Sequence, residues 1–455
     1  MQGEGLTRRS TRMWVQVAFV VVALAASWAP IVDNPLGDDW EGRLLGRFAL
    51  QTHNFWSDGA VASSFATSLD PYRPGFNYAH HPPLTNGLMT VATGVFGVGP
   101  WQLRLVPMLA AAVSLILLAA VLRRFAVRET LVGPTVLFVA ALPLFWSFAR
   151  AGLGIAPLLA VVWLLALPPE AQRRWSGPIA LVGVLASWAG ALSVLGAMIV
   201  MIRARSPAFR ALAIGAFMGA AITAIWILNA TSMTELLGHA ATRTLGGVFA
   251  FSDFTRQQLA FTVGGMTVIG LLVAIPATAY AFARTPAREP LLIITVAATI
   301  VLTALNQAAF SRSFLALPFV AVFGISVGVS AEAIARRVDG RARLLGGVLT
   351  LASVMMFFTF ILTARPYTLS AEASDAGFLL EDVDKPPDVE LLYIDEAIIA
   401  PRWAAWLWDV EVAAPDGSPH EGAVILTSTA ERPPWIGEAV VIAVRGDYLL
   451  LRVGH

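Results

Sequence analysis

The residues best suited to acid–base chemistry stand early in the chain, in the run Gly37-Asp38-Asp39-Trp40-Glu41. One interpretation is local: Asp38 is the N-cap of a helix and Glu41 its third residue, the spacing of a capping box. Asp39 would then pair with Arg43 four residues on. The other interpretation is chemical, because a carboxylate within hydrogen-bond reach of a hydroxyl can act as its general base. Both stay open, and Asp38 and Asp39 are the candidate catalytic residues.

A second polar motif is Tyr78-Ala79-His80-His81-Pro82-Pro83-Leu84. Two prolines enforce an extended approach and then start a helix cleanly, so a loop-to-helix junction explains the pattern. Adjacent histidines point in different directions, which disfavours both on one metal ion. The functional alternative is that His81 alone binds a phosphate or, together with Asp38, a divalent metal. The cofactor therefore stays unknown, and the absence of cysteine removes thiolate metal sites.

Membrane helices must position these motifs. Apolar residues make up 57% of the 455 positions and charged residues only 13%, too little charge for the surface of a soluble protein. The formal net charge of +1 gives no field that favours a nucleic-acid partner, so membrane lipids are the expected surroundings. Apolar runs near the roughly 20 residues that a bilayer requires occur at 13–31, 103–122, 131–148, 152–167, 211–228, 257–283, 291–308, 313–334 and 344–363.

Arginine clusters at the ends of these runs orient the chain, because positively charged loops stay in the cytoplasm. Arg8 to Arg12 place the N-terminus inside, and the first run lacks a small-x-small cleavage site, so it is an uncleaved span. The polar stretches 33–83 and 229–256 are then outer loops. Residues 177–202, flanked by arginine on both sides, are interpreted as two short helices in a hairpin that enters from the cytoplasm.

Two segments complete the predicted architecture. The segment 84–98 is too short to cross and is expected to be a helix at the outer interface. Residues 1–364 then form an all-α polytopic domain of about eleven membrane segments in the inner or plasma membrane. The tail, 365–455, is predicted to be a small α/β domain outside, with Trp403 and Trp406 in its own core. Its expected elements are strands at 389–394, 440–444 and 448–453 and a helix at 398–410.

Cationic residues gather at the outer interface. The middle of each predicted span lacks charged residues, which counts against proton-coupled transport. Arginine binds phosphate bidentately, and the candidates for this contact are Arg104, Arg150, Arg243 and Arg312. For each one alone, an ordinary contact with lipid headgroups is the alternative. A reaction site at the outer face is expected, with Arg104 and then Arg243 as the first candidates.

Taken together, the motifs resemble a known family. An acidic pair after the first span, an outer loop of about fifty residues, His81-Pro82-Pro83-Leu84, Phe96-Gly97 and the run from Trp101 to Leu105 are similar to membrane glycosyltransferases of the GT-C fold. Within that fold the chain resembles the protein O-mannosyltransferase and aminoarabinose transferase group, which is glycosyltransferase family 39-like. The similarity is strong over 13–125 and weaker over 126–335, and the tail has no specific match.

The resemblance implies a polyprenyl-phosphate sugar as donor, phosphate as leaving group and inversion at the sugar carbon. By motif, Asp38 matches the first residue of the family's Asp-Glu pair, a catalytic or metal-linked carboxylate, and Asp39 replaces the Glu. His81 matches the motif histidine, and Arg104 the arginine that opens the next span. Gly152-Leu153-Gly154 follows Arg150 where the family has an acidic residue. The resemblance therefore does not extend to a second carboxylate there, or to a metal that it would hold.

Two functions fit these features. The first is an enzyme that moves a hexosyl or pentosyl group from a polyprenyl-phosphate donor to a lipid, glycan or protein acceptor. The alternative is a non-catalytic carrier of lipid-linked glycans, which is expected to have inverted repeats with broken helices near the midplane. A carrier would not need the acidic pair, so Asp38 and Asp39 together with His81-Pro82-Pro83 favour the enzyme.

Overall fold

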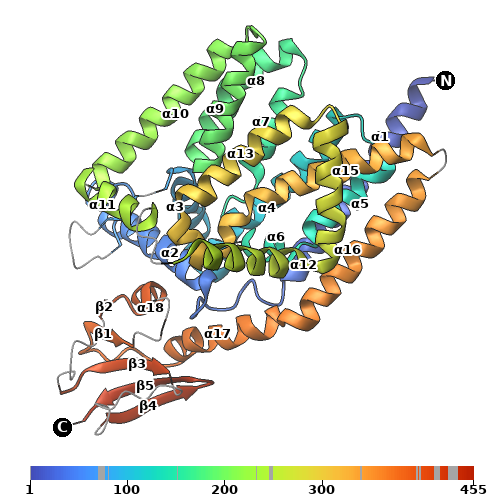
Figure 1. The fold of residues 1–455 in the computed structure, drawn as a ribbon. Coiled ribbons are helices and arrows are strands. Elements are labelled where there is room, and N and C mark those ends of the chain that lie inside the picture. The colour runs from blue at the N-terminus through green and yellow to red at the C-terminus, as the bar shows by residue number, and fades with distance from the viewer. Residues whose placement is uncertain are drawn as a thin grey trace. The chain divides into compact units, whose positions relative to one another are not determined.

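The fold is that of a computed structural model of the whole chain. The structure describes residues 2–69, 77–79, 81–150, 152–231, 233–244, 249–338, 341–395, 398, 401–413, 421–428 and 439–454. These residues are mainly helical, and a small sheet lies near the C-terminus (Figure 1).

Six of the described helical segments are long and apolar enough to cross a bilayer. They belong to α1 (Gln2–Trp28), α4 (Pro100–Arg124), α10 (Phe209–Ala230), α12 (Phe251–Arg284), η1 with α15 (Ser313–Ala316 and Pro318–Arg337) and α16 (Ala342–Ala364). Each coincides with a run predicted from the sequence. The chain is therefore a multi-pass membrane protein.

Shorter helices fill the remaining apolar runs. The run 131–148 is divided into α5 (Glu129–Ala140) and α6 (Pro143–Phe148). Proline starts a helix readily but donates no backbone hydrogen bond, which accounts for the new start at Pro143. The runs 152–167 and 291–308 contain α7 (Ala156–Leu165), α13 (Arg288–Ala304) and α14 (Asn306–Ser311). Helices as short as these do not establish the predicted count of membrane segments.

The expected helix pair at 177–202 is confirmed as α8 (Pro169–Ala186) and α9 (Trp188–Arg203), although α8 begins earlier than predicted. Ser187 is extended between them, and its hydroxyl accepts the Gly190 N–H at 3.0 Å. Small residues let the backbones approach: a Cβ at Gly190 would lie 2.3 Å from the Gly183 carbonyl oxygen. Helices α8, α9 and α10 lie side by side (Figure 1).

The second outer loop and the helix after it differ from expectation. Residues 229–256 contain a helix, α11 (Met233–Thr244). Helix α12 is broken at Thr267, whose φ of 58° and ψ of 164° lie outside the helical region. The predicted run 257–283 is therefore two helical pieces joined at this residue.

The chain divides into two compact units. The first comprises residues 1–27, 80–85 and 107–364, and the second comprises 28–79, 86–106 and 365–455. The second unit holds α2 (Trp40–Asp58), most of α3 (Leu84–Phe96), α17 (Pro366–Glu381) and α18 (Pro401–Trp408). The tail thus shares a unit with the first outer loop, whereas the sequence suggested a separate domain.

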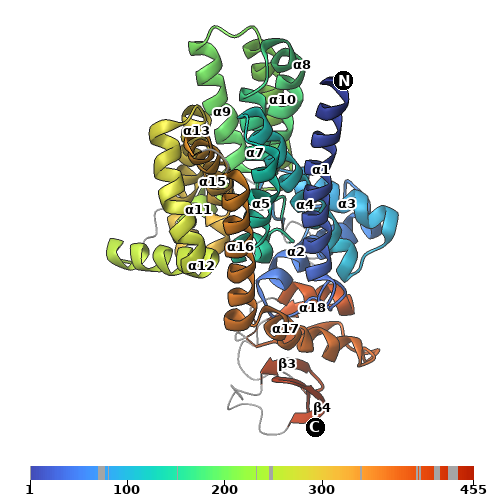
Figure 2. The same cartoon turned by 90° about the vertical axis from the view of Figure 1, so that its right-hand side faces the viewer.

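The sheet of the second unit has the order β2-β1-β3-β5-β4. Its strands are β1 (Leu391–Ile394), β2 (Glu411–Ala413), β3 (Val424–Ser428), β4 (Ala439–Arg445) and β5 (Tyr448–Val453). Strand β1 is parallel to β2 and β3, and β5 is antiparallel to β3 and β4. The predicted hairpin around Gly446-Asp447 is confirmed as β4–β5. Both views place α17 and α18 on the same side of the sheet (Figures 1 and 2).

Helix α18 packs against α2. A Cβ at Gly46 would lie 2.9 Å from the Cβ of Trp403, so the two helices touch at this point. Trp403 is fully buried and Trp406 only partly. Trp403 was predicted to pack in the tail's own core, and the structure adds a contact with α2 of the same unit.

Candidate functional site

The N-cap of α2 is Asp39, one residue later than predicted. The Asp39 Oδ1 accepts the Gly42 N–H at 2.6 Å, and the Asp39 carbonyl accepts the first helical hydrogen bond, from Arg43. The Arg43 guanidinium lies 5.1 Å from the centre of the Trp40 ring. The capping role therefore belongs to Asp39 and not to Asp38.

Asp38 contacts the tail through its backbone. Its N–H donates to the Ala373 carbonyl of α17 at 3.0 Å. Its carboxylate lies near Tyr448, the first residue of β5. Burial, followed by the negative charge of Asp38, raises the pKa of Tyr448 far above its ordinary value. The phenol therefore stays protonated at neutral pH.

The loop before α2 lies directly on α17. A Cβ at Gly37 would lie 2.0 Å from the Ala373 carbonyl oxygen, and one at Gly377 would lie 2.4 Å from that of Leu36. The Ser374 hydroxyl donates to the Pro35 carbonyl at 3.1 Å. Side chains are excluded at both glycines by backbone contact. The loop before α2 and helix α17 therefore touch through their backbones.

Arg104 is buried in an ion pair. Its Nε lies 2.9 Å from Glu41 Oε1, and the two side chains are 3% and 6% exposed. Its Nη1 donates to the Val32 and Asn34 carbonyls at 3.0 and 2.7 Å. These donors bind α2 and the loop before it, so the phosphate contact predicted for Arg104 stays a prediction that competes with them. Glu41 is likewise engaged across the fold, which the capping-box interpretation did not foresee.

Buried amides order the rest of the first outer loop. Gln51 Nε2 donates to the carbonyls of Thr67 and Tyr78 at 3.1 and 3.0 Å. Asn86 Nδ2 donates to Gln51 Oε1 and to the Ala66 carbonyl. Buried polar groups of this kind specify one conformation when they are satisfied. The loop is thus a built part of the second unit, on which Asp38 is held.

The remaining candidates belong to the first unit. Arg150 is 7% exposed, and its guanidinium lies 5.0 Å from the Trp146 ring centre. Arg243, in the last turn of α11, and Arg312, between α14 and η1, are partly exposed. His81 is exposed, and His80 lies outside the described residues.

The elements that carry these three arginines pack together. Helix α11 contacts α14, which Arg312 follows, and η1 contacts α6, which ends just before Arg150. Aromatic pairs join the same region: Phe148 and Phe314 are 5.9 Å apart, and Phe249 stacks on Phe310 at 4.4 Å. Three of the four predicted cations thus come from one part of the fold.

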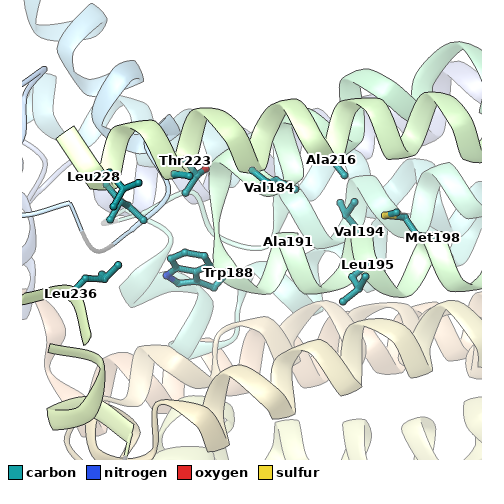
Figure 3. Close-up of a pocket in the computed structure, with 13 residues that line it drawn as sticks. Val184, Trp188, Ala191, Val194, Leu195, Met198, Ala216, Thr223, Leu228 and Leu236 are labelled. Carbon is teal, nitrogen blue, oxygen red and sulfur yellow. The ribbon is translucent and has the colours of Figure 1, made fainter. Parts of the chain in front are cut away.

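An apolar cavity of about 470 Å³ lies among α8, α9, α10 and α11. Trp188, Leu228 and Leu236 are at one end, and Leu195, Met198 and Ala216 are toward the other (Figure 3). Leu236 belongs to α11, and Arg243 follows it by seven residues. Two helical turns separate the pair, so both lie on nearly the same face of α11, about 10 Å apart along its axis.

No protein-family model matches the chain, and a search of curated proteins finds no match. Solved structures do match. ArnT from Cupriavidus metallidurans bound to undecaprenyl phosphate gives a TM-score of 0.67 at 15% identity, over 96% of this chain and 98% of ArnT. Its apo state gives 0.64 at 16% identity, over 97% and 98% of the two chains. An oligosaccharyltransferase of Archaeoglobus fulgidus with Zn and sulfate gives 0.54 at 13% identity, over 90% and 68%.

The chain has the GT-C fold. The match runs from end to end of ArnT, so it includes the tail, where the sequence alone had no specific resemblance. The expectation of this fold from the first outer loop and its flanking spans is confirmed.

One GT-C structure contains zinc, so the side chains that could bind a metal ion in this chain are of interest. Within the described residues, no three His, Asp or Glu side chains gather as metal ligands would. Asp39 caps α2, and Glu41 pairs with Arg104. A divalent metal bound by Asp38 and His81 stays a prediction.

Tyr448 is the residue of this site that sequence reasoning missed. Its local pattern indicates only the start of a strand after the Gly446-Asp447 turn. No spacing relates it to Asp38, which lies near the other end of the chain. Its proximity to Asp38 follows from the tertiary fold alone.

Proposed function

We propose that this protein transfers a sugar, hexosyl or pentosyl, from a polyprenyl-phosphate donor to a lipid, glycan or protein acceptor of the cell envelope. The observation that carries the proposal is the end-to-end similarity of its fold to that of ArnT, a structure solved with undecaprenyl phosphate. Two predictions from the sequence agree with it: the acidic loop lies at the outer face of the membrane, and the middle of each predicted span lacks charged residues. Similarity of fold alone does not give activity, so the case depends on the side chains.

Asp38 is the proposed general base. The acceptor hydroxyl oxygen attacks the anomeric carbon while the bond from that carbon to the phosphate oxygen breaks. The hydroxyl proton passes to the Asp38 carboxylate, and the bonding electrons leave with polyprenyl phosphate. A single displacement of this kind inverts the configuration at the sugar carbon.

Arg150, Arg243 and Arg312 are the proposed ligands of the departing phosphate. Developing negative charge on a leaving group is stabilised by cations fixed in advance, and guanidinium groups match phosphate geometry. Their elements pack together in the first unit. Arg104 is left out of this set because of its ion pair with Glu41. His81 stays a further candidate on account of its exposure.

The apolar cavity is the proposed seat of part of the polyprenyl chain. It is lined by aliphatic side chains and Trp188, and α11 carries both its Leu236 wall and Arg243. A ring introduced by Ala216→Phe should raise the KM for donor with little change in kcat. Ile214→Phe, on an exposed position of α10, is the control. An unchanged KM for donor in the Ala216→Phe variant would show that the polyprenyl chain does not bind in this cavity.

The finer topology is part of the same proposal. We infer a cytoplasmic N-terminus, about eleven membrane segments and an outer tail beginning near residue 365, from the arginine placement. The contact of Asp38 with Ala373 supports an even number of crossings between residues 28 and 365.

The decisive experiment is transfer from radiolabelled polyprenyl-phosphate sugars by purified protein, with membrane extract as acceptor. Asp38→Asn cannot accept the proton, so transfer should fall by roughly 100-fold or more, the scale of general-base catalysis. Asp39→Asn is the matched control, because asparagine caps a helix about as well as aspartate. It should retain most activity.

Two results would count against the proposal. A parent protein that binds donor but transfers no sugar would favour the carrier alternative. An Asp38→Asn variant as active as the parent would remove Asp38 from the mechanism.

A further inference from the structure

A second cleft, of about 330 Å³, lies in the first unit at the ends of the apolar segments of α1, α4 and α7. Its lining residues are Met13 and Trp14 of α1, Ala120, Arg123 and Arg124 of α4, and Trp163 of α7. This volume is near the lower end of the range for small-molecule sites, roughly 300–1,000 Å³. Nothing in the proposed sugar transfer uses this cleft.

The length of α4 places the cleft at a surface of the membrane. Its 25 residues extend about 37 Å at 1.5 Å per residue, which exceeds the roughly 30 Å of the hydrocarbon core. Arg123 and Arg124 are its last two residues, so they lie among the lipid headgroups. Tryptophan favours the same level of a bilayer, because its ring is apolar and its N–H is polar. The cleft has two such residues, Trp14 and Trp163.

The cleft carries an excess of positive charge. Arg123 Nη1 lies 3.4 Å from Glu129 Oε1, and both side chains are partly exposed. This contact is longer than a hydrogen bond, and a guanidinium group has five N–H donors, so Arg123 keeps donors for another anion. In the part of the chain that the structure describes, no carboxylate pairs with Arg124. Two cations therefore face the cleft against one carboxylate.

The two arginines are not required to end α4. Basic side chains near the end of a helix often donate to its last carbonyl groups. Here the carbonyl groups of residues 121–123 accept hydrogen bonds from the N–H groups of residues 125–127. Ala126, with φ of 56°, adopts the left-handed conformation that makes this backbone closure possible. The guanidinium groups are thus left to bind a ligand in the cleft.

The apolar walls of the cleft are held by the fold. Met13 is almost fully buried. Trp163 meets the ring of Trp175 edge to face, with 6.2 Å between the ring centres, and the Arg174 guanidinium lies 5.6 Å from the same Trp175 ring. Walls that are fixed before binding reduce the entropy that a ligand must lose. They suit the carbon atoms of a ligand whose anionic group reaches the arginines.

We propose that this cleft binds the headgroup of an anionic phospholipid, with Arg123 and Arg124 at the phosphate and the two tryptophans against the adjoining lipid carbons. Guanidinium groups match the geometry of phosphate, and basic pockets between membrane helices bind such headgroups. A free phosphate ion makes no use of the apolar walls, which favours the lipid as the source of the phosphate. The inference is independent of sugar transfer, since it needs only that the chain lies in a membrane.

The test is titration of the purified full-length protein in a neutral detergent, with bound lipid counted by native mass spectrometry. Phosphatidylglycerol should bind more tightly than phosphatidylcholine, whose choline group cancels the charge of the phosphate. Each arginine near an anionic headgroup contributes about fivefold in affinity. Arg123→Gln together with Arg124→Gln should therefore weaken phosphatidylglycerol binding roughly 30-fold. Inorganic phosphate at the same concentration should not displace the lipid.

Matched controls separate a site from a general attraction of charge. Arg203→Gln together with Arg205→Gln makes the same change at the end of α9, outside the cleft, and should bind phosphatidylglycerol as the parent does. Both pairs of arginines are exposed, so both variants should unfold near the parent's midpoint without added lipid. Ala120→Phe places a ring in the cleft and keeps its charge, so it should weaken binding. Val113→Phe, on an exposed position of the same helix, should not.

Several results would overturn the inference. Equal affinity for phosphatidylglycerol and phosphatidylcholine would show that the cleft does not select an anionic lipid. Equal weakening in the two arginine pairs would indicate attraction by the overall charge of the protein. Displacement by inorganic phosphate would assign the cleft to a soluble phosphate compound. A folded Ala120→Phe protein that binds as the parent does would place the lipid elsewhere, and if this variant does not fold, the two arginine pairs decide.

Discussion

Replacing Arg104 by methionine should destabilise the protein strongly. The change removes the partner of Glu41 from a pair whose side chains are 3% and 6% exposed, and it leaves the Val32 and Asn34 carbonyls without this donor. Breaking a buried ion pair from one side costs about 3–5 kcal/mol, because the other charge stays buried. Arg104→Met should lower the free energy of unfolding by that amount, measured by tryptophan fluorescence during urea unfolding in detergent.

Two further variants serve as controls for the buried Arg104–Glu41 pair. Arg123→Met lies in the same helix, but Arg123 is 42% exposed and 3.4 Å from Glu129, so its loss should cost under about 1 kcal/mol. Replacing Arg104 and Glu41 together by Met and Leu should recover much of the loss, since apolar groups of similar volume often substitute for a buried pair. An Arg104→Met protein as stable as the parent, with weakened donor binding, would refute this account and restore Arg104 as a phosphate ligand.

Other variants test the cap, the topology and the tail. Asp39→Ala should lose about 1 kcal/mol of stability and Asp39→Asn almost none, and an equal loss in both would contradict the cap. In this cysteine-free chain, impermeant maleimide should label Ser57→Cys but not Ser206→Cys in intact cells, and labelling of the latter would contradict the hairpin interpretation. Partial burial and neighbouring carboxylates raise the pKa of Glu381 above 4.5, so its charge opposes folding as pH rises through that raised pKa. Glu381→Gln should therefore raise the unfolding midpoint modestly at pH 7, with the difference gone below about pH 4.

Features with local signals were predictable. The long spans follow from apolar runs, and the β4–β5 hairpin from alternation around Gly446-Asp447. Helix α2 was also expected, but its cap was displaced by one residue. Both aspartates satisfy the local pattern, and the choice depends on the Ala373 carbonyl, which takes the Asp38 N–H.

Features that depend on distant partners were not predictable. Arg104 and Glu41 are 63 residues apart, and nothing in either neighbourhood specifies the pair. Helix α17 was missed for another reason. Its buried face includes Ser370, Ser374 and Gly377, so the helix has no continuous apolar stripe for periodicity to reveal.

The hydrogen bond from Ser374 to the Pro35 carbonyl joins residues 339 positions apart. At about 5–20 residues per second, a ribosome needs roughly 20–70 s to synthesise the chain between them. Throughout that interval the acidic loop has emerged without the helix against which its backbone packs. The loop can reach its final conformation only after α16 and α17 have been synthesised. A chain stopped before residue 366 would keep the described membrane spans and yet expose the loop, so proteases on that face could distinguish unfinished chains from complete ones.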